Sequence, residues 1–201
     1  MSHSYDQRTA KRLVKARKLS LVLDIDHTLL HAVADPRAAA LLQSGRFPEM
    51  HVIRLRGTDG RPHYVKLRPF LREFLRRAAE ICELSIYTHG TRPYAEAVAE
   101  LLDKDKRLFA SRIVSRTDCP ELGVSKKSLQ RLFPCDDSMV LVVDDTAVVW
   151  QGAVGFWFCF LLFAFCFLLF AFCFLLFALL LSSSSSSPPS KRETLGPRSA
   201  T

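Results

Sequence analysis

The six cysteines of this 201-residue sequence lack every arrangement that would give them a chemical role. No two of them form a C-x-x-C pair, and the opening residues, MSHSYDQRTAKR, lack the apolar run of a secretory signal. Cys82, Cys119 and Cys135 are not followed at the sixth position by arginine, which a C-x-x-x-x-x-R loop requires. We therefore expect no disulfide framework, no zinc site and no cysteine nucleophile.

The stretch 153–181 has no charged residue, and ten of the fifteen phenylalanines lie in it. FCFLLFA occurs there three times without change, at 158–164, 165–171 and 172–178. Because every position is apolar, a water-soluble coiled coil is excluded. Two interpretations stay open. The stretch is either a membrane anchor, whose helix of about 43 Å would cross a hydrocarbon core of roughly 30 Å with tilt, or the product of a repeat expansion or a faulty gene model.

The length and charge of the chain set the outline of the remaining segments. With 49% apolar and 24% charged residues, the chain is long enough for one globular domain with its own core. We expect a basic amino-terminal arm at 1–17, a globular domain at 18–152, the apolar repeat at 153–181 and a disordered tail at 182–201. The net charge of +8 suits an acidic partner, although the arm can equally be a solvated, flexible segment.

Two aspartates follow the first buried strand that the sequence predicts. The apolar run 19–23 ends at Asp24, with Asp26 and Thr28 at alternate positions after it. Open parallel sheets bind ligands at the carboxyl ends of their strands, so this carboxylate pair would face a crevice. D-x-D-x-T alone is a weak signal, and its place after a buried strand strengthens it.

A second strand is predicted at 84–87, between helices that begin at Pro69 and Pro93. The strand ends at Thr88, a hydroxyl close to a glycine that lets backbone amides approach a ligand. The positions expected on the buried helix faces are Phe70, Leu71, Phe74, Leu75, Ala78 and Ile81 in the first helix and Tyr94, Ala97, Val98, Leu101 and Leu102 in the second. This alternation predicts an α/β fold with a parallel sheet.

A third apolar run, 139–143, ends in Asp144 and Asp145, and a basic pair, Lys126 and Lys127, precedes a predicted helix upstream of it. A nucleophilic carboxylate, a hydroxyl, a cation and a carboxylate pair can converge on one phosphate. Phosphoryl transfer needs such convergence, because its cost lies in positioning and in neutralising charge on the equatorial oxygens.

Together these motifs resemble the haloacid dehalogenase superfamily, and residues 19–150 are similar to the FCP/SCP family of phosphatases that act on the carboxyl-terminal domain of RNA polymerase II. The strings that carry the resemblance are LVLDIDHTLLHA, YVKLRPFLREFL, LSIYTHGTRPYAEAVAELLD, KSLQRLFPCDDSMV and LVVDDTAVVW. IYTHGTRPYA and RLFPCDDSMV look closer to the FCP branch. The resemblance implies a haloacid dehalogenase-like parallel sheet with flanking helices.

Roles for individual residues follow from the resemblance. It implies that Asp24 attacks phosphorus and becomes an aspartyl phosphate, while Asp26 protonates the leaving serine oxygen and later activates water. Thr28 would fix the loop. Thr88 would hydrogen-bond the phosphoryl oxygens, and Lys127 would neutralise them.

The resemblance also implies Mg²⁺ as cofactor and a phosphoserine protein as partner. The ion would lie between the Asp24 carboxylate, the backbone carbonyl of Asp26 and Asp145, with Asp144 as a direct or water-mediated ligand. Hard oxygen ligands with retained waters suit Mg²⁺. The substrate would be the carboxyl-terminal repeats of RNA polymerase II, and no direct nucleic-acid binding is expected.

Each of these residues has a purely structural alternative. Asp24 and Asp26 could cap a loop, although two acids at the end of a buried strand cost desolvation without a cation. Thr88 could be a turn residue. Lys127 could be a surface lysine, with Lys126 as the alternative cation at the phosphate.

Other residues near the motifs are expected to have no part in the chemistry. His27, His31 and His89 lack metal-ligand spacing with one another, so we expect them to be loop residues. The stretch 32–62 is predicted to form loops around a short hairpin at 51–56. In the resembled family, an insertion near this region helps to hold the peptide.

After Trp150 the family pattern would continue with further sheet and helix, so we expect a domain truncated at its carboxyl end. Three functions compete: a protein serine/threonine phosphatase acting on an acidic phosphopeptide, a phosphatase for small metabolites, and an inactive or membrane-tethered phosphopeptide-binding remnant. A polymerase substrate predicts a nuclear protein. A real anchor at 153–181 would instead hold the catalytic domain on the cytosolic face of an internal membrane.

Overall fold

The computed structural model describes residues 2–119, 126–129 and 138–150, with side chains from residue 8 onward. The chain divides into two compact units, Met1–Phe165 and Cys166–Thr201, and all described residues belong to the first. The apolar repeat, the Ser/Pro-rich tail and most of the helix predicted downstream of Lys127 lie outside the described residues. Those parts of the sequence interpretation stay predictions.

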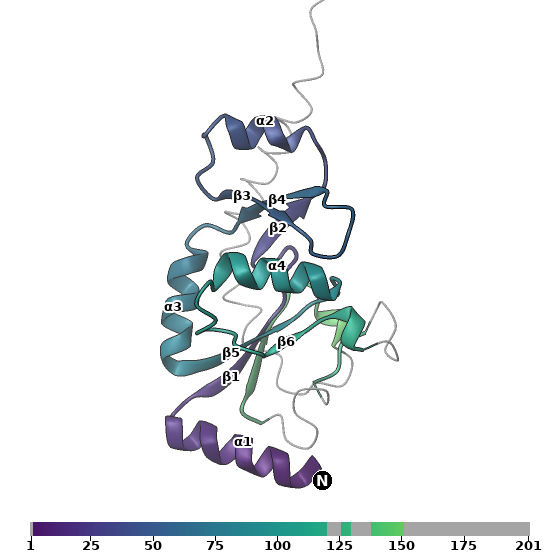
Figure 1. Ribbon diagram of the computed structural model, residues 1–201. Coiled ribbons are helices and arrows are strands. Elements are labelled where there is room, and N and C mark those ends of the chain that lie inside the picture. Colours follow the sequence, from purple (N-terminus) through teal and green to yellow (C-terminus); the bar gives the residue numbers. More distant parts are fainter. Residues whose placement is uncertain (1, 120–125, 130–137, 151–201) are drawn as a thin grey trace, which may run out of the picture. The chain divides into compact units, whose positions relative to one another are not determined.

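The three predicted strands all lie in one four-stranded parallel sheet (Figure 1). Its order is β6-β5-β1-β7, and its members are β1 (Leu19–Leu23), β5 (Cys82–Tyr87), β6 (Ile113–Val114) and β7 (Val140–Val143). β1 pairs in parallel with both β5 and β7. The predicted α/β architecture is therefore confirmed. β6 was missed because a two-residue strand has no periodicity to detect.

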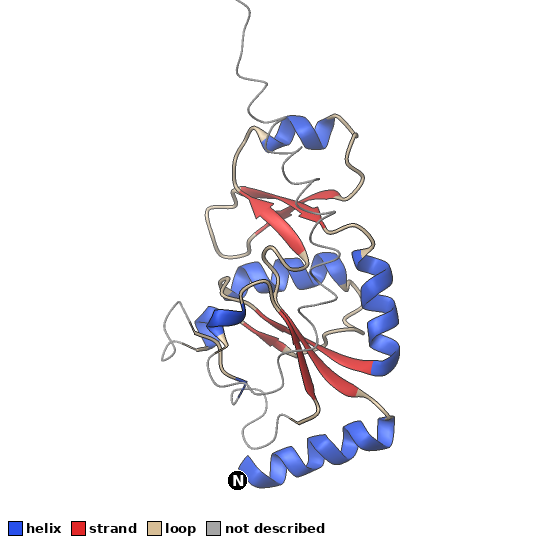
Figure 2. Cartoon of the chain, turned by 180° about the vertical axis from the view of Figure 1, so that it is seen from behind, coloured by secondary structure: helices blue, strands red, loops and turns tan. Residues whose placement is uncertain are grey.

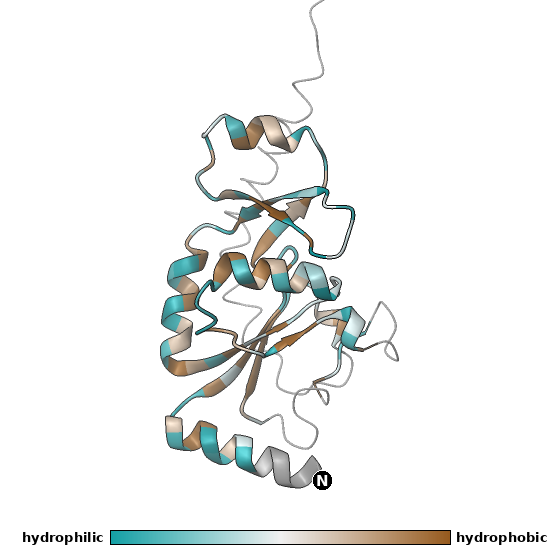
Figure 3. Ribbon diagram, viewed as in Figure 1, coloured by the Kyte–Doolittle hydropathy of each residue, from teal (hydrophilic) through white to brown (hydrophobic). Residues whose placement is uncertain are grey.

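Both faces of this sheet are buried, which explains why its strands read as continuous apolar runs. Leu21 and Leu23 of β1 belong to the hydrophobic cluster on one face, and Val22 belongs to the cluster on the other. The first cluster also contains side chains of α3 (Leu71–Ile81) and α4 (Arg92–Leu102). Figure 3 shows the apolar colour concentrated along the strands and polar colour on the outer helix surfaces.

Helix α3 buries a narrower stripe than the sequence predicted. Leu71 and Leu75 are buried against the sheet, and α3 passes directly into β5. Phe70, Phe74 and Ile81 were expected on the same face, but they are 87%, 40% and 67% exposed. Phe70 precedes α3 with a left-handed backbone (φ 61°), so it does not belong to the helix. At about 100° per residue, Phe74 and Ile81 lie on a flank beside the Leu75 stripe, so that part of the prediction is wrong.

Helix α4 agrees better with its predicted pattern. Tyr94, Val98 and Leu102 are buried, and the helix has proline in its first turn. Ala97 and Leu101 are half-buried and pack against the first cluster.

The stretch between β1 and α3 forms more structure than the hairpin predicted at 51–56. It folds into a three-stranded antiparallel sheet of order β2-β4-β3, with β2 (Leu30–Val33), β3 (Met50–Arg54), β4 (Pro62–Leu67) and the short helix α2 (Ala38–Gln43). We call this sheet and α2 the insert (Figure 2). The predicted hairpin at 51–56 overlaps only β3. Its partner β4 begins at residue 62, the last residue of the stretch expected to be loop, and β2 begins at residue 30, before that stretch.

The amino-terminal segment is helical, so the interpretation as a flexible arm is wrong for the described residues. Helix α1 spans Ser2–Ala16 and buries Leu13. Arg12 hydrogen-bonds Glu83 on β5 at 2.8 Å, and Lys18 donates to the Ala79 carbonyl of α3 at 2.5 Å. Basic residues of this segment therefore hold the helix against the domain.

Within the described residues, no helix is both long enough and apolar enough to cross a membrane. The stretch 153–181, on which the anchor interpretation rests, is outside that part of the chain.

The burial pattern of α3 leads to a prediction about stability. Leu75→Ala should lower the free energy of unfolding by about 2–5 kcal/mol, because it leaves a cavity in the cluster under α3. Ile81→Ala on the exposed flank should change it by less than about 0.5 kcal/mol. Urea unfolding of the two variants measures the difference, and equal losses would contradict this placement of α3.

Candidate active site

The ends of β1, β5 and β7 bring the predicted site residues to one edge of the sheet. Leu23 of β1 is in register with Ile86 of β5 and Val143 of β7, so Asp24 leaves the sheet beside the segments that carry Thr88 and Asp144. The backbone N–H of Asp24 donates to the carbonyl of Val143 at 3.0 Å. This arrangement follows from the parallel register alone.

Lys127 is buried between two of these carboxylates. Its Nζ donates to Asp24 Oδ1 and to Asp144 Oδ2, each at 2.6 Å, and only 3% of the residue is exposed. The interpretation as a surface lysine is therefore wrong. Lys126, the alternative cation, is exposed.

Negative charge exceeds positive charge in this cluster. Carboxylate oxygens of Asp24, Asp144 and Asp145 all lie within 4.8 Å of one another, and Lys127 is the cation that contacts them in the described part of the chain. Buried carboxylates are costly unless cations neutralise them. A further cation would remove the excess, and an all-oxygen set of donors suits Mg²⁺. The predicted contribution of Asp26 is its backbone carbonyl, which stays a prediction.

Burial raises the pKa of Asp24 from 3.8 to about 7, although Lys127 lowers it. The nearby charges of Asp144 and Asp26 raise it further. Without a metal, the Asp24 carboxyl is therefore only partly ionised near neutral pH. Any positive charge that approaches it favours the carboxylate form.

Asp26 is held by a tyrosine that the sequence interpretation counted as core. Tyr94 Oη donates to Asp26 Oδ1 at 2.6 Å, and the phenol is 8% exposed. Burial, followed by the Asp26 charge, raises the pKa of Tyr94, so the phenol keeps the proton that it donates. Gly90 lies against the same ring, where a Cβ atom would collide with Tyr94 Cδ1. The glycine of the T-H-G segment therefore leaves space for the tyrosine that positions Asp26.

Thr28 connects the first and last strands of the site. Its Oγ1 accepts a hydrogen bond from the backbone N–H of Asp145 at 2.9 Å, and the residue is fully buried. Arg68, at the end of β4, donates from Nε to the carbonyl of Thr28 at 2.6 Å and from a terminal nitrogen to that of His27 at 2.7 Å. These bonds tie the insert to the loop that carries Asp26.

Asp144 is oriented by two groups besides Lys127. Trp150 Nε1 donates to its Oδ2 at 2.8 Å, and the backbone N–H of Thr146 donates to its Oδ1 at 2.8 Å. The rings of Trp150 and Tyr87 meet edge to face at 5.3 Å, with Lys127 Nζ 5.5 Å and 5.8 Å from their respective centroids. The two aromatic rings thus form an apolar wall beside the lysine.

Thr88 is 1% exposed, and its Oγ1 accepts the backbone N–H of Gly90 at 2.9 Å. No described hydrogen bond joins it to Asp24, so its phosphate-binding role stays a prediction. His89 is half-buried close to Lys127, and burial, then the lysine charge, lowers its pKa. The ring of His27 lies 5.0 Å from that of His31.

Sequence reasoning missed the site roles of Arg68, Tyr94 and Trp150. Tyr94 stood in the predicted buried stripe of α4, where its ring fits a core position as well as a site position. Trp150 was quoted only as part of a motif. The one available signal was a polar tip on a buried aromatic side chain, which must find a partner.

A parallel sheet with four aspartates beyond the ends of β1 and β7, and a buried lysine among them, has the arrangement that the sequence resemblance predicted for a haloacid dehalogenase-like phosphatase. Residues 19–154 match the family described as NLI interacting factor-like phosphatase. The chain belongs to this family, as the sequence resemblance predicted.

Similar proteins agree with this assignment. The chain is 40% identical over 155 residues to an RNA polymerase II C-terminal domain phosphatase of Schizosaccharomyces pombe, and 38% identical over 143 residues to its counterpart of the same name in Homo sapiens. These alignments cover 73% and 71% of the chain but only 21% and 14% of the relatives. The solved structure of Fcp1, described as an essential RNA polymerase II CTD phosphatase, matches with a TM-score of 0.67 and 38% identity. That match covers 73% of this chain and 42% of the other.

Removing the Tyr94 hydroxyl should lower phosphatase turnover about ten- to one-hundredfold, because Asp26 would lose the donor that fixes its rotamer. Steady-state kinetics of Tyr94→Phe should show the loss in kcat with little change in KM, together with a shifted pH profile. Tyr64→Phe on β4 also removes one phenol hydroxyl and is the matched control. Equal effects of the two changes would contradict the positioning role.

The raised pKa of Asp24 predicts how stability without metal depends on pH. The folded state binds this proton more tightly than the unfolded state, so the Asp24 contribution to stability falls as pH rises from about 4 to about 7. In EDTA, Asp24→Asn should therefore be more stable than the natural chain at pH 8, with the difference shrinking toward pH 4. Urea unfolding at both pH values measures this. A variant that is less stable at pH 8 would refute the prediction.

Proposed function

We propose that this chain is a Mg²⁺-dependent protein serine/threonine phosphatase that works through an aspartyl-phosphate intermediate. The observation that carries the proposal is the buried Lys127 ammonium, which contacts Asp24 and Asp144 at 2.6 Å beside the further carboxylate of Asp145. Such a cluster supplies a nucleophile, a fixed cation and metal ligands at one point.

Asp24 is the nucleophile in this proposal. Its carboxylate attacks phosphorus and takes over the phosphoryl group, while the bond from phosphorus to the serine oxygen breaks. Lys127 already lies against Asp24 Oδ1, so its ammonium is placed to neutralise phosphoryl oxygens on that carboxylate. Thr88, at the end of the neighbouring strand, is the proposed neutral donor to the same oxygens.

Asp26 is the general acid and then the general base. It gives a proton to the departing serine oxygen, and it takes a proton from the water that hydrolyses the phosphoaspartate. The Tyr94 hydrogen bond holds one carboxylate oxygen of Asp26, which leaves the other for proton transfer. Thr28 and Arg68 fix the backbone of the loop that carries it.

The metal ligands proposed are Asp24, Asp144, Asp145 and the backbone carbonyl of Asp26. Bound there, Mg²⁺ would offset carboxylate charge and withdraw charge from the phosphoryl oxygens. Trp150 and Thr28 support this arrangement, since they hold the Asp144 carboxylate and the Asp145 backbone.

The proposed substrate is phosphoserine in the carboxyl-terminal repeats of RNA polymerase II, and the proposed location is the nucleus. The support is the naming of relatives that are 36–40% identical to the chain. The chain spans only about a fifth of those relatives or less, so substrate and location are inferred for its catalytic part. Its net charge of +8 suits an acidic, phosphorylated segment.

The test is phosphate release from phosphoserine peptides of the polymerase repeats by the full chain. Release should need Mg²⁺, stop with EDTA, and fall at least about a thousandfold in Asp24→Asn, because the nucleophile is lost. Asp59→Asn, an exposed change outside the site, is the control for loss of one carboxylate.

Parallel assays of phosphate release from sugar phosphates distinguish the competing functions. Equal turnover of sugar phosphates and phosphopeptides would favour the small-metabolite alternative. Phosphopeptide binding by the folded chain without any release would favour the inactive remnant.

A further inference from the structure

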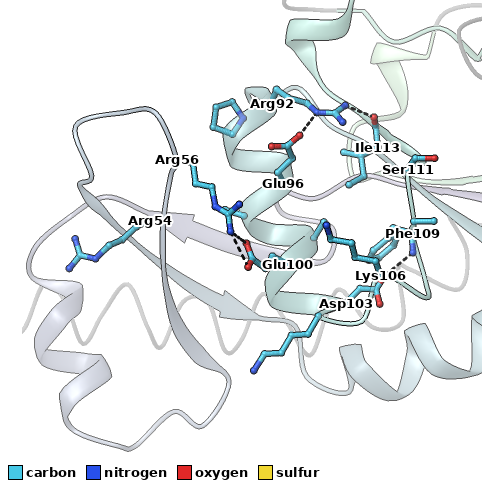
Figure 4. A pocket seen from close by; sticks show the side chains of 15 residues that line it. Arg54, Arg56, Arg92, Glu96, Glu100, Asp103, Lys106, Phe109, Ser111 and Ile113 are labelled. Atoms are coloured by element: carbon cyan, nitrogen blue, oxygen red, sulfur yellow. Dashed lines mark hydrogen bonds and ion pairs between the residues drawn. The ribbon is translucent and has the colours of Figure 1, made fainter.

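A cleft of about 360 Å³ lies between the insert and α4 (Figure 4). Arg54 and Arg56 stand on the insert side, one face of α4 runs through the middle, and the segment 103–113 forms the opposite side. Five of the lining side chains are cations and three are carboxylates, a net charge of +2. The aspartates of the active site do not line it.

All three carboxylates in the cleft already have partners. Asp103 accepts the backbone N–H groups of residues 107, 108 and 109 at 2.8–2.9 Å. Glu96 pairs with Arg92 at 2.8 Å. Glu100 pairs with Arg56 at 3.2 Å, where both side chains are mostly exposed and readily exchange partners.

The lysines Lys104 and Lys106 have no ion-pair partner in the described part of the chain, and both are exposed. They sit on a loop whose shape is fixed. Lys106 and Ala110 adopt left-handed backbone angles, φ 55° and φ 50°, which non-glycine residues rarely adopt. The Asp103 carboxylate holds this loop from within. Strained and over-determined segments of this kind cluster at binding sites.

Helix α4 links the cleft to the active site. Tyr94, in its first turn, contacts Asp26, and Pro93 on the adjoining face lines the start of the cleft. From Tyr94 to Leu102, where α4 ends, the helix runs about 12 Å along its axis, and Lys104 follows two residues later. An extended peptide covers about 12 Å in about four residues, and about six residues reach past the end of the helix.

We propose that the cleft binds a second phosphate on the same substrate chain, about four to six residues from the phosphoserine at Asp24. Lys104 and Lys106 supply the charge from one side, and Arg56 faces them from the insert side, where its guanidinium meets Glu100 of α4 (Figure 4). Arg56 exchanges Glu100 for the phosphate, which it can bind with two parallel hydrogen bonds. This inference rests on the proposed function for the first phosphate, but its binding part can be tested without catalysis.

A phosphopeptide suits the cleft better than a nucleic acid does. Glu96 and Glu100 lie along α4 and would repel a continuous phosphate backbone, whereas one phosphate can lie beyond them. Single-stranded nucleic acids also use exposed aromatic rings for base stacking. The aromatic side chain among the lining residues, Phe109, is 1% exposed.

The experiment compares peptides with one phosphoserine and peptides with a second phosphoserine four, five or six residues to either side. For the natural full chain, kcat/KM should be about tenfold higher for the best doubly phosphorylated peptide, through a lower KM. Lys104→Gln/Lys106→Asn removes both lysines, and asparagine tolerates the left-handed angle at 106. This variant should reduce the preference to less than about twofold.

Lys11→Gln/Lys15→Gln on α1 removes the same charge elsewhere and should keep the preference. No preference in the natural chain, or equal loss in both double variants, would overturn the second site. Peptide dissociation constants on Asp24→Asn should show the same tenfold difference, which tests the cleft even if the chain releases no phosphate. Single-stranded RNA of equal charge that displaces the doubly phosphorylated peptide equally well would also overturn the assignment.

Discussion

The ammonium of Lys127, shared at 2.6 Å between the buried carboxylates of Asp24 and Asp144, is the contact on which the rest of the site depends. Removing Lys127 would leave the buried carboxylates without the cation that contacts them, a loss of roughly 3–5 kcal/mol in comparable cases. One lysine does not balance the neighbouring acids, and burial raises the pKa of Asp24 to about 7. The same imbalance that costs stability therefore favours binding of a further cation beside Asp24.

Segments far apart in the sequence hold this cluster in place. Trp150 hydrogen-bonds Asp144 and packs edge to face on Tyr87, while Thr28 bonds the Asp145 backbone across the sheet. Arg68 joins the insert to the loop that carries Asp26 and Thr28. On α4, Tyr94 supports Asp26, and another face of the same helix lines the cationic cleft. One helix thus positions Asp26, the proposed general acid, and also lines the cleft proposed to bind the substrate chain.

Much of the fold was predictable because parallel strands leave a strong signal. The run 19–23 has the bounds of β1, and strand ends followed by aspartate indicated the site before any contact was known. Contacts that depend on how elements pack were not predictable. Phe70 matched the helical period yet is exposed, and Tyr94 matched it equally well yet meets Asp26. The extent of the insert was underestimated because its strands pair across gaps that look like loop.

The central claim is that these acids and Lys127 form a phosphoryl site on Asp24. A crystal structure of the full chain with Mg²⁺ and beryllium fluoride, a mimic of the phosphoaspartate, tests it most directly. The account predicts a beryllofluoride group on the Asp24 carboxylate, its fluorines contacted by Lys127 Nζ and Thr88 Oγ1, with Mg²⁺ bound to Asp24 and Asp145. Beryllofluoride on another residue would contradict the account. So would a structure in which Lys127 Nζ hydrogen-bonds Asp24 Oδ1 but none of the fluorines.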